Sequence, residues 1–323
     1  MRLTLPDNVA PRDEPPLVHI MMATFQGAGY LQAQLDSIAA QTHARWTLAI
    51  SDDGSSDNTL AICESFARQH PERVHIVQGP RQGATANFFH LIARAPATPE
   101  ADFYAFSDQD DVWFPDKLSA ALNRLAQPTA TSGRPLLYCG RTRLVNEHLE
   151  PIGLSPLPAR PLGFGNALVQ NIVNGNTMVF NMALLNLLRR VQPAHAVLHD
   201  WTAYLAVTGC AGDLRFDPEP HLAYRQHAAN VVGSQSRWRD KVNRIRMVFK
   251  GQYRQWGNQT EAILDDLAPC LNASALAQAK IFKSMRNSPS AWSRLKAGWR
   301  SGIWRQTRSG ELSFFIALAC KKL

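Results

Sequence analysis

The chain has 323 residues, of which 45% are hydrophobic and 19% are charged. This balance is typical of a globular protein with a substantial core and argues against intrinsic disorder. Five scattered cysteines without a CxxC pair suggest neither a zinc site nor a disulfide framework, so a reducing cytoplasm is the expected compartment. No apolar run approaches the roughly 20 residues that span a bilayer. Residues 1–16 are expected to form a loose leader.

The net charge of +8 is unevenly distributed along the chain. Residues 235–323 contain 17 Lys/Arg and 5 Asp/Glu, whereas residues 1–234 contain 17 Lys/Arg and 21 Asp/Glu. A mildly acidic body followed by a basic tail suggests that the body performs the chemistry. The tail is then expected to meet an anionic surface, either membrane lipid or nucleic acid.

The first part of the chain alternates between short apolar runs and amphipathic segments. Strands are predicted at 17–25, 46–53, 74–79 and 102–111, and helices at 28–41, 57–69 and 84–95. This alternation predicts an α/β fold of βαβ units, with a largely parallel sheet covered on both faces. Ligands of such sheets bind beyond the carboxyl ends of the strands.

The pattern is mixed beyond residue 134. Strands are predicted at 135–145, 176–181 and 221–227, and helices at 182–191 and 200–209. In the basic tail, helical runs such as 241–256 are expected, with interruptions at Gly251 and 287–289.

The segment FSDQDDVW contains Asp108, Asp110 and Asp111 directly after an apolar strand. Hard cations such as Mg²⁺ or Mn²⁺ bind one or two such carboxylates together with substrate phosphates. A bound cation would also relieve the repulsion among the three charges. The alternative is a solvated loop in which Asp111 or Asp116 caps the helix that begins near Pro115.

The segment ISDDGSSDNT contains Asp52 and Asp53 at the end of another predicted strand. Asp-Gly with two serines is typical of a turn, and Asp57 fits a helix N-cap. Two adjacent carboxylates exceed what a turn requires, and one of them could accept a hydrogen bond from an N–H of a pyrimidine ring.

Two later segments each carry a structural and a functional interpretation. In LHDWTAYL, Asp200 fits either a helix cap or a general base that removes a proton from an incoming hydroxyl. In AYRQHAANVVG, His227 is either an ordinary surface histidine or a nitrogen ligand to a metal. In the functional interpretation Arg225 would contact a phosphate.

The segment GPRQGATANF places Gly79 and Gly83 around Arg81 and Gln82. A glycine-rich turn before a helix can hold a phosphate or a base. The spacing of a Walker lysine is missing, so a P-loop is not predicted.

Taken in order, these segments resemble the family-two glycosyltransferases, which have the GT-A fold. The resemblance is carried over residues 17–233 by HIMMATF, LQAQLDSIAAQTHARWTLAISDDGSSDNT, FSDQDDVWFPDKL, HDW and YRQHAANVVG. The SDQDDVWFPDKL and YRQH…NVVG forms look most like the bacterial rhamnosyltransferase-like subgroup, which builds O-antigens and related surface polysaccharides.

The resemblance implies a nucleotide site at the ends of the first two strands. Ala23 and Thr24 would line the nucleotide pocket, and Asp53 would contact the pyrimidine N3–H while Asp52 supports the turn. Further contacts to nucleotide or sugar are implied at Arg81 and Asn87.

The resemblance also implies a metal site and a catalytic base. Asp110 would be the direct ligand of Mg²⁺ or Mn²⁺, Asp108 would lie nearer the ribose, and Asp111 is an adjacent alternative ligand. His227 would complete metal or diphosphate binding, and Asp200 matches the catalytic aspartate.

Two positions depart from the family pattern. Phe25-Gln26 replaces a frequent Tyr-Asn pair, which affects packing near the base pocket. His199 stands where an acid often precedes the base, which leaves Asp200 itself in place.

The implied reaction is a direct displacement with inversion at the anomeric carbon. The expected donor is a dTDP-sugar, with L-rhamnose first, or a UDP-sugar, and the expected acceptor is a polyprenyl-diphosphate-linked glycan. Residues 17–234 would form the GT-A catalytic domain and residues 235–323 a basic helical region. The protein would be cytoplasmic and peripheral to the inner membrane, its tail binding an anionic membrane surface or only capping the core.

Two other functions are alternatives to glycosyl transfer. A nucleotidyltransferase that makes the activated sugar would need a glycine-rich GxGTR-like loop after the first strand, and MATFQGAGY does not supply it. A non-catalytic protein could bind nucleic acid through the aromatic and basic residues of RQW, AWSRLKAGW and SGIW. Salt dependence distinguishes nucleic-acid binding, which falls steeply with ionic strength, from membrane binding. No nucleic-acid partner is expected.

Overall fold

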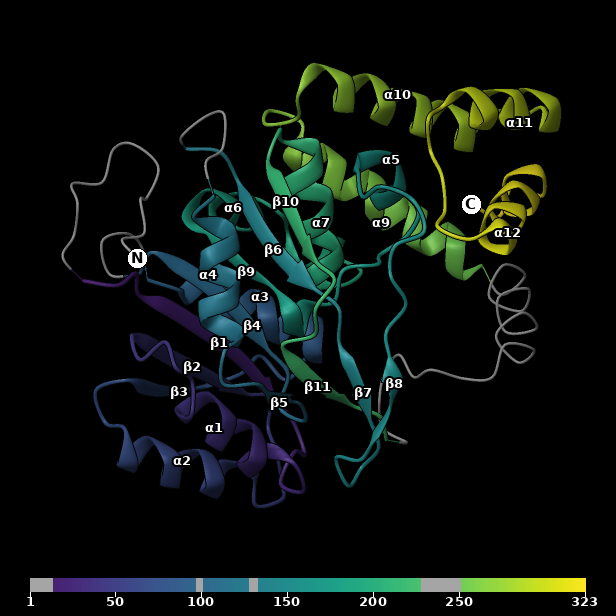
Figure 1. Cartoon of the computed structure of the whole chain (residues 1–323). Helices are drawn as coiled ribbons and strands as arrows, with labels where there is room; N and C mark the ends of the chain where they lie inside the picture. Colours follow the sequence, from purple (N-terminus) through teal and green to yellow (C-terminus); the bar gives the residue numbers. More distant parts are fainter. Residues whose placement is uncertain (1–13, 97–100, 128–132, 228–250) are drawn as a thin grey trace. The chain divides into compact units, whose positions relative to one another are not determined.

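The computed structural model describes residues 14–96, 101–127, 133–227 and 251–323, and these form two compact units. Among them, the first unit comprises the residues up to 157 together with 173–189 and 212–227, and it holds both β-sheets. The second unit comprises 158–172, 190–211 and 251–323 and consists of helices and loops (Figure 1). The predicted domain boundary at 234–235 lies outside the described residues.

The first unit is built on a seven-stranded sheet in the order β10-β6-β9-β4-β1-β2-β3 (Figure 1). Four of its strands pair in parallel: β1 (Val18–Thr24), β2 (Trp46–Asp52), β3 (Val74–Gln78) and β4 (Phe103–Ser107). The connecting helices are α1 (Leu31–Ala39), α2 (Thr59–Gln69) and α3 (Ala84–Arg94). The predicted βαβ alternation is confirmed. Since Thr24 and Asp52 are partners in the register, the carboxyl ends of β1 and β2 meet.

Beyond β4 the sheet becomes mixed. The added strands are β9 (Val179–Asn181), β6 (Leu136–Gly140) and β10 (Asp213–Asp217). Strand β9 is antiparallel to both β4 and β6, whereas β10 is parallel to β6. Helix α6 (Met182–Leu188) follows β9 directly.

A second sheet of four short strands has the order β5-β11-β7-β8. Its strands are β5 (Val112–Trp113), β7 (Arg143–Val145), β8 (Pro151–Leu154) and β11 (Leu222–Arg225). The single strand predicted at 135–145 is therefore wrong, because β6 and β7 belong to different sheets. Between β6 and β7, the N–H of Arg141 donates to the carbonyl of Asp217 at 2.9 Å. The chain passes to the second sheet after this hydrogen bond.

The core has one layer on each face of the main sheet. On one face, Ile20 and Ile50 share a core with residues of α1, α2 and α4 (Lys117–Leu125): Leu35, Phe66 and Leu122. On the other, Phe106 packs against Phe88 of α3, with ring centroids 5.4 Å apart, and against Phe180 of β9 at 4.9 Å. Alternation along the strands thus buries both faces, as an α/β fold requires.

The second unit contains α5 (Phe164–Ala167), α7 (His199–Gly209), α9 (Gln252–Leu267), α10 (Ala273–Asn287), α11 (Ala291–Arg300) and α12 (Arg308–Ala319). Helix α9 begins directly after Gly251, which has φ 80°, and residues 288–290 separate α10 from α11, so the interruption predicted at 287–289 is confirmed. The part of the predicted helix at 241–250 lies outside the described residues. Of the helices in the described ranges, none combines the length and apolar character that crossing a bilayer requires.

Candidate active site

The end of β2 forms a turn that is organised by one carboxylate. Asp52 accepts hydrogen bonds from Thr24 Oγ1 at 3.1 Å, the Gly54 N–H at 3.1 Å and the Ser55 N–H at 2.8 Å. The Ser55 hydroxyl donates to the same carboxylate at 2.6 Å. Asp52 is thereby engaged in joining β1 to the turn, in keeping with the supporting role predicted for it.

The neighbouring carboxylate, Asp53, is held by the loop between β3 and α3. Its two oxygens accept from the N–H groups of Arg81 at 2.6 Å and Gly83 at 2.7 Å, and the residue is 7% exposed. Arg81 adopts φ 60°, and its side chain lies against Gly54. Because a carboxylate has about four acceptor positions, two backbone bonds leave capacity for a ligand N–H.

Asn87 of α3 lies beside this carboxylate and is buried. Its amide nitrogen donates to the carbonyl of Ser51 at 2.8 Å, and its Oδ1 has no hydrogen-bond partner among the described residues. A Cβ at Gly79 would lie 2.8 Å from that oxygen and 2.9 Å from the carbonyl of Asp52. Glycine is therefore required for this close approach, and the predicted residues Asp53, Arg81 and Asn87 do come together.

The loop after β1 is joined to the acidic turn by Gln109, which sequence reasoning missed. Its side-chain amide accepts from the Phe25 N–H at 2.9 Å and donates to the Phe25 carbonyl at 2.8 Å. Gln26 has φ 49°, and its side-chain oxygen accepts from the N–H groups of Ser56 and Asp57 at 3.3 and 3.2 Å. Phe25 and Gln26, which depart from the family pattern, thus join the turns directly, Phe25 through its backbone and Gln26 through its side chain.

The three aspartates after β4 have different surroundings. Asp111 is fully buried: Asn176 Nδ2 donates to one of its oxygens, and the N–H of Arg225 donates to the other at 3.4 Å. Asp108 and Asp110 are partly exposed. The alternative of a solvated loop is wrong for Asp111. Burial raises the pKa of Asp111 well above its usual range, and the charges of Asp108 and Asp110 raise it further.

Lys117 at the start of α4 is the buried cation nearest in sequence to this turn. Its ammonium lies over the Trp113 ring, 3.4 Å from the centroid, and has no hydrogen-bond acceptor among the described residues. Burial lowers the pKa of Lys117 to about 7, against the opposing attraction of Asp111 and Asp108. At neutral pH Lys117 is therefore only partly protonated, and its charge offsets those of the acidic turn only in part.

Asp110 and His227 form the polar pair that faces outward from this turn. Asp110 Oδ2 and His227 Nε2 are 2.8 Å apart, and the two side chains are 20% and 10% exposed. The imidazole stacks on Tyr30, with ring centroids 4.8 Å apart. Arg225 donates through Nε to the Asp110 carbonyl at 2.9 Å, and its guanidinium also covers Tyr30. The predicted His227 is thus brought to Asp110 from 117 positions away.

The chemistry of this pair fits a divalent cation, although the described ranges contain no group of three or more His, Cys, Asp or Glu side chains arranged to hold a metal. A carboxylate and an imidazole are sufficient protein ligands for Mn²⁺ where substrate phosphates and water supply the rest. Asp111 has no exposed surface for this purpose. Among the three candidates, the geometry therefore favours Asp110.

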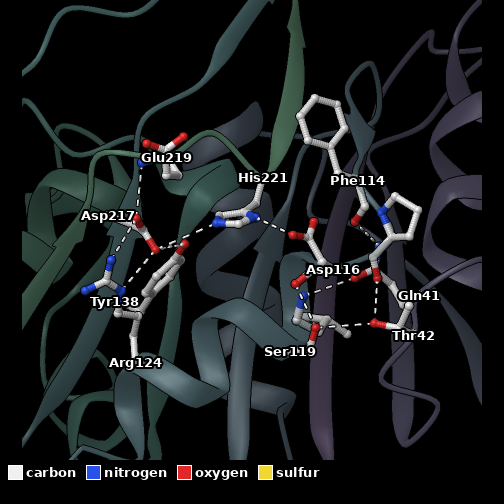
Figure 2. Close-up of polar contacts among 12 residues, drawn as sticks. Gln41, Thr42, Phe114, Asp116, Ser119, Arg124, Tyr138, Asp217, Glu219 and His221 are labelled. Atoms are coloured by element: carbon white, nitrogen blue, oxygen red, sulfur yellow. Dashed lines mark hydrogen bonds and ion pairs between the residues drawn. The ribbon is translucent and has the colours of Figure 1, made fainter.

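Strand β11, which leads to Arg225 and His227, is anchored by a polar network shown in Figure 2. His221 lies between two carboxylates, with Nδ1 3.0 Å from Asp116 and Nε2 3.7 Å from Asp217. Asp217 also accepts from Arg124 of α4 at 3.2 Å. Asp116 occupies the N-cap position of α4 but makes no capping hydrogen bond with its side chain. The network fixes where β11 starts and hence where His227 lies.

Asp200 belongs to the second unit, in the first turn of α7. The N-cap of this helix is Leu198, so the capping role considered for Asp200 is wrong. Its Oδ1 accepts from the Trp201 N–H at 2.6 Å, and the indole of Trp201 donates to the carbonyl of Ala167 at 2.7 Å. The side chain is partly exposed. A negative charge in the first turn is stabilised by the helix dipole.

Comparisons with known proteins define the class. The model of glycosyl transferase family 2 matches residues 19–186. The dTDP-rhamnosyl transferase RfbG of Shigella flexneri is 31% identical over 241 residues, covering 72% of this chain and 81% of that protein. An Escherichia coli glucosyltransferase, WfgD, which transfers glucose from UDP-Glc to α-D-GlcNAc-diphosphoundecaprenol, is 31% identical over 111 residues, covering 34% of this chain and 41% of its own length.

Among solved structures, S. aureus TarS 1–349 in complex with UDP-GlcNAc has a TM-score of 0.51 at 12% identity, covering 88% of each chain. This likeness concerns the fold alone. The chain belongs to glycosyl transferase family 2, within a rhamnosyltransferase-like subgroup, and has the GT-A fold with a helical C-terminal extension.

We predict that Gly27→Ala destabilises the loop that joins the two turns, whereas Gly29→Ala does not. A Cβ at Gly27 would lie 2.2 Å from Gln109 Oε1, and one at Gly29 would meet no atom within 4 Å. Loss of the two Gln109 hydrogen bonds should lower the free energy of unfolding by about 1–3 kcal/mol. Urea denaturation of the two variants measures this difference. Equal stability would show that Gln109 does not join the loops.

Proposed function

We propose that the protein is an inverting glycosyltransferase that transfers L-rhamnose from dTDP-L-rhamnose to a lipid-linked oligosaccharide in the synthesis of O-antigen or another surface polysaccharide. The donor assignment is supported by the 31% identity to a dTDP-rhamnosyl transferase across most of the chain. The observation that carries the proposed activity is the Asp110–His227 pair, which is adjacent to a buried third aspartate at the carboxyl end of β4.

The nucleotide is proposed to bind over the ends of β1 and β2. The Asp53 carboxylate would accept the pyrimidine N3–H, in an orientation fixed by its two bonds to the β3–α3 loop. The orphaned Oδ1 of Asn87 offers a second acceptor beside it. Ala23 and Thr24 would line the pocket wall, and Arg81 would lie along its rim.

The diphosphate is proposed to bind next to Asp110 and His227, with Asp108 nearer the ribose. Mg²⁺ or Mn²⁺ held by Asp110 and His227 would supply Lewis-acid stabilisation of the negative charge on the departing diphosphate. Asp111 would position this pair from behind, because Arg225 bonds both Asp111 and the Asp110 carbonyl. The charge of Arg225 would add to the potential that attracts the diphosphate.

Asp200 is proposed as the general base. The acceptor hydroxyl oxygen forms a bond to the anomeric carbon while the bond from that carbon to the diphosphate breaks, and Asp200 takes the hydroxyl proton. A single carboxylate is sufficient because the displacement needs no covalent glycosyl-enzyme. The first-turn position in α7 stabilises the ionised form that a base requires.

The acceptor is proposed to be a glycan on polyprenyl diphosphate, reached by a cytoplasmic enzyme peripheral to the inner membrane. WfgD, matched over about a third of this chain, uses a diphosphoundecaprenol acceptor. A basic C-terminal region, with 17 Lys/Arg against 5 Asp/Glu in residues 235–323, is suited to an anionic membrane surface.

The proposed donor is tested by incubating the full chain and a lipid-diphosphate glycan with dTDP-rhamnose, UDP-glucose, UDP-GlcNAc and GDP-mannose. We expect dTDP release and glycan extension with dTDP-rhamnose, loss of both with EDTA, and recovery with Mn²⁺ or Mg²⁺. Full transfer in EDTA would overturn the metal requirement. Transfer from another donor alone would overturn the rhamnose assignment.

We predict that Asp110→Ala and Asp200→Asn each lower the transfer rate by about 10²–10⁴-fold. The first removes the carboxylate at the diphosphate, and the second removes the base without changing the size of the side chain. Asp36→Asn, an exposed position on α1, is the matched control and should retain wild-type activity. Circular dichroism checks that each variant is folded. A folded Asp200→Asn enzyme with full activity would reject the base.

A further inference from the structure

Helix α11 has two exposed tryptophans on one side. Trp292 is 75% exposed and Trp299 is 82% exposed, the highest values among the exposed large hydrophobic residues of the described chain. They are seven positions apart, or about two helical turns, and therefore lie on the same face. Leu295, which is partly exposed, lies between them on that face at i+3.

The orientation of this face is fixed by the opposite side of α11. There Arg294 is buried and donates to the carbonyls of Leu318 at 2.7 Å and Ala319 at 2.6 Å, at the end of α12. Gly298 lies against Leu318, where a Cβ would come within 2.5 Å. Helix α11 therefore packs on α12 (Figure 1) through Arg294 and Gly298. The two exposed tryptophans lie on the opposite side of the helix.

Basic residues surround the apolar face. Residues 291–323 contain seven Lys/Arg and a single acidic residue, Glu311. Lys296 and Arg300 lie on α11 itself and are exposed. Helix α12 adds a second exposed apolar pair on its outer side, with Leu312 at 63% and Ile316 at 42%. An apolar stripe with aromatic residues and basic flanks is the pattern of a helix that lies in a membrane interface.

We propose that the face of α11 defined by Trp292, Leu295 and Trp299, flanked by Lys296 and Arg300, docks on a bilayer containing anionic lipid. The indoles would lie at the level of the headgroups, where tryptophan is enriched, and each basic residue near the surface would add electrostatic attraction to the anionic lipid. This inference deepens the proposed function and rests on its lipid-linked acceptor.

The positive charge beside this face of α11 favours an anionic bilayer over a second copy of the chain as its partner. Two such faces would bring Lys296 and Arg300 of both copies together, and like charges across an interface are unfavourable. An anionic headgroup layer neutralises the same residues. Two exposed tryptophans about 11 Å apart along the helix axis, with Leu295 between them, also suit shallow insertion into headgroups better than a compact protein pocket.

The test is flotation of the full chain with vesicles of phosphatidylcholine alone and of phosphatidylcholine with one quarter phosphatidylglycerol. We expect binding to the anionic vesicles that falls at least about tenfold in Trp292→Ser/Trp299→Ser and in Lys296→Glu/Arg300→Glu. The matched control is Ile152→Ser/Leu154→Ser, which removes exposed apolar residues of β8 that are 55% and 44% exposed. The control should bind like the wild type.

Several outcomes would overturn the proposal. One is equal binding of the tryptophan variant and the wild type to the anionic vesicles. A second is equal binding of the wild type to both vesicle types. A third is the absence of vesicle binding together with concentration-dependent dimers that the tryptophan variant does not form. Salt-sensitive binding to single-stranded RNA in place of vesicles would assign the face to nucleic acid. Fluorescence quenching by brominated lipid should fall in Trp292→Ser/Trp299→Ser if these indoles are the inserted ones.

The membrane-docking proposal and the proposed function can be rejected independently of each other. Hydrolysis of the nucleotide sugar in the absence of acceptor should be unchanged in Trp292→Ser/Trp299→Ser, because these residues are outside the proposed catalytic machinery. Vesicle binding without transfer from any donor would reject the function and retain the docking face. Transfer to a water-soluble acceptor without vesicle binding would reject the docking face and retain the function.

Discussion

The arrangement of the first unit depends on how it accommodates three carboxylates within four positions after β4. Each one has a different environment. Asp111 is buried against Asn176 and the backbone of Arg225, Asp110 faces His227, and Asp108 remains partly exposed. Burying a carboxylate is costly unless hydrogen bonds and opposite charge compensate. Lys117, whose pKa is lowered to about 7 by burial, contributes only part of such a charge and donates no hydrogen bond to any described residue.

This constraint explains why distant segments converge on the turn. Strand β11 must reach it to deliver both the Arg225 backbone and the His227 ring, and the network around His221 fixes the start of that strand. Gln109, inside the acidic turn, extends the same organisation to the loop after β1. The acidic turn, the loop after β1 and β11 therefore form one connected structure, as the proposed diphosphate site requires.

Hydrophobic periodicity was sufficient to predict the parallel half of the sheet, because its strands are short apolar runs bounded by turns. It failed at 135–145, where two apolar runs on either side of 140–143 were taken as one strand, although the chain passes from one sheet to another between Gly140 and Arg143. It also missed β8 and β10, whose side chains are exposed or partly exposed over most of their length. Such strands carry little alternation for a pattern to detect.

From the sequence, the candidate site could be assembled as far as its carboxylates, the late histidine, and Arg81, Asn87 and Arg225. Their residue types and positions at strand ends were visible, and the structure brings Asp110 and His227 together. The residues that hold them in place were not visible. Asn176, Gln109 and Tyr30 act through contacts with segments far away in the chain, and nothing in their local sequence distinguishes them from ordinary loop and helix residues.

The central claim is that Asp110 and His227 normally share a divalent cation with a nucleoside diphosphate. Its most direct measurement is Mn²⁺ binding followed by electron paramagnetic resonance, with and without dTDP, in the wild type and in folded Asp110→Asn and His227→Ala variants. The account predicts that dTDP tightens Mn²⁺ binding in the wild type and that each substitution weakens it by at least about tenfold. Mn²⁺ binding that is equally tight in all three proteins would contradict it.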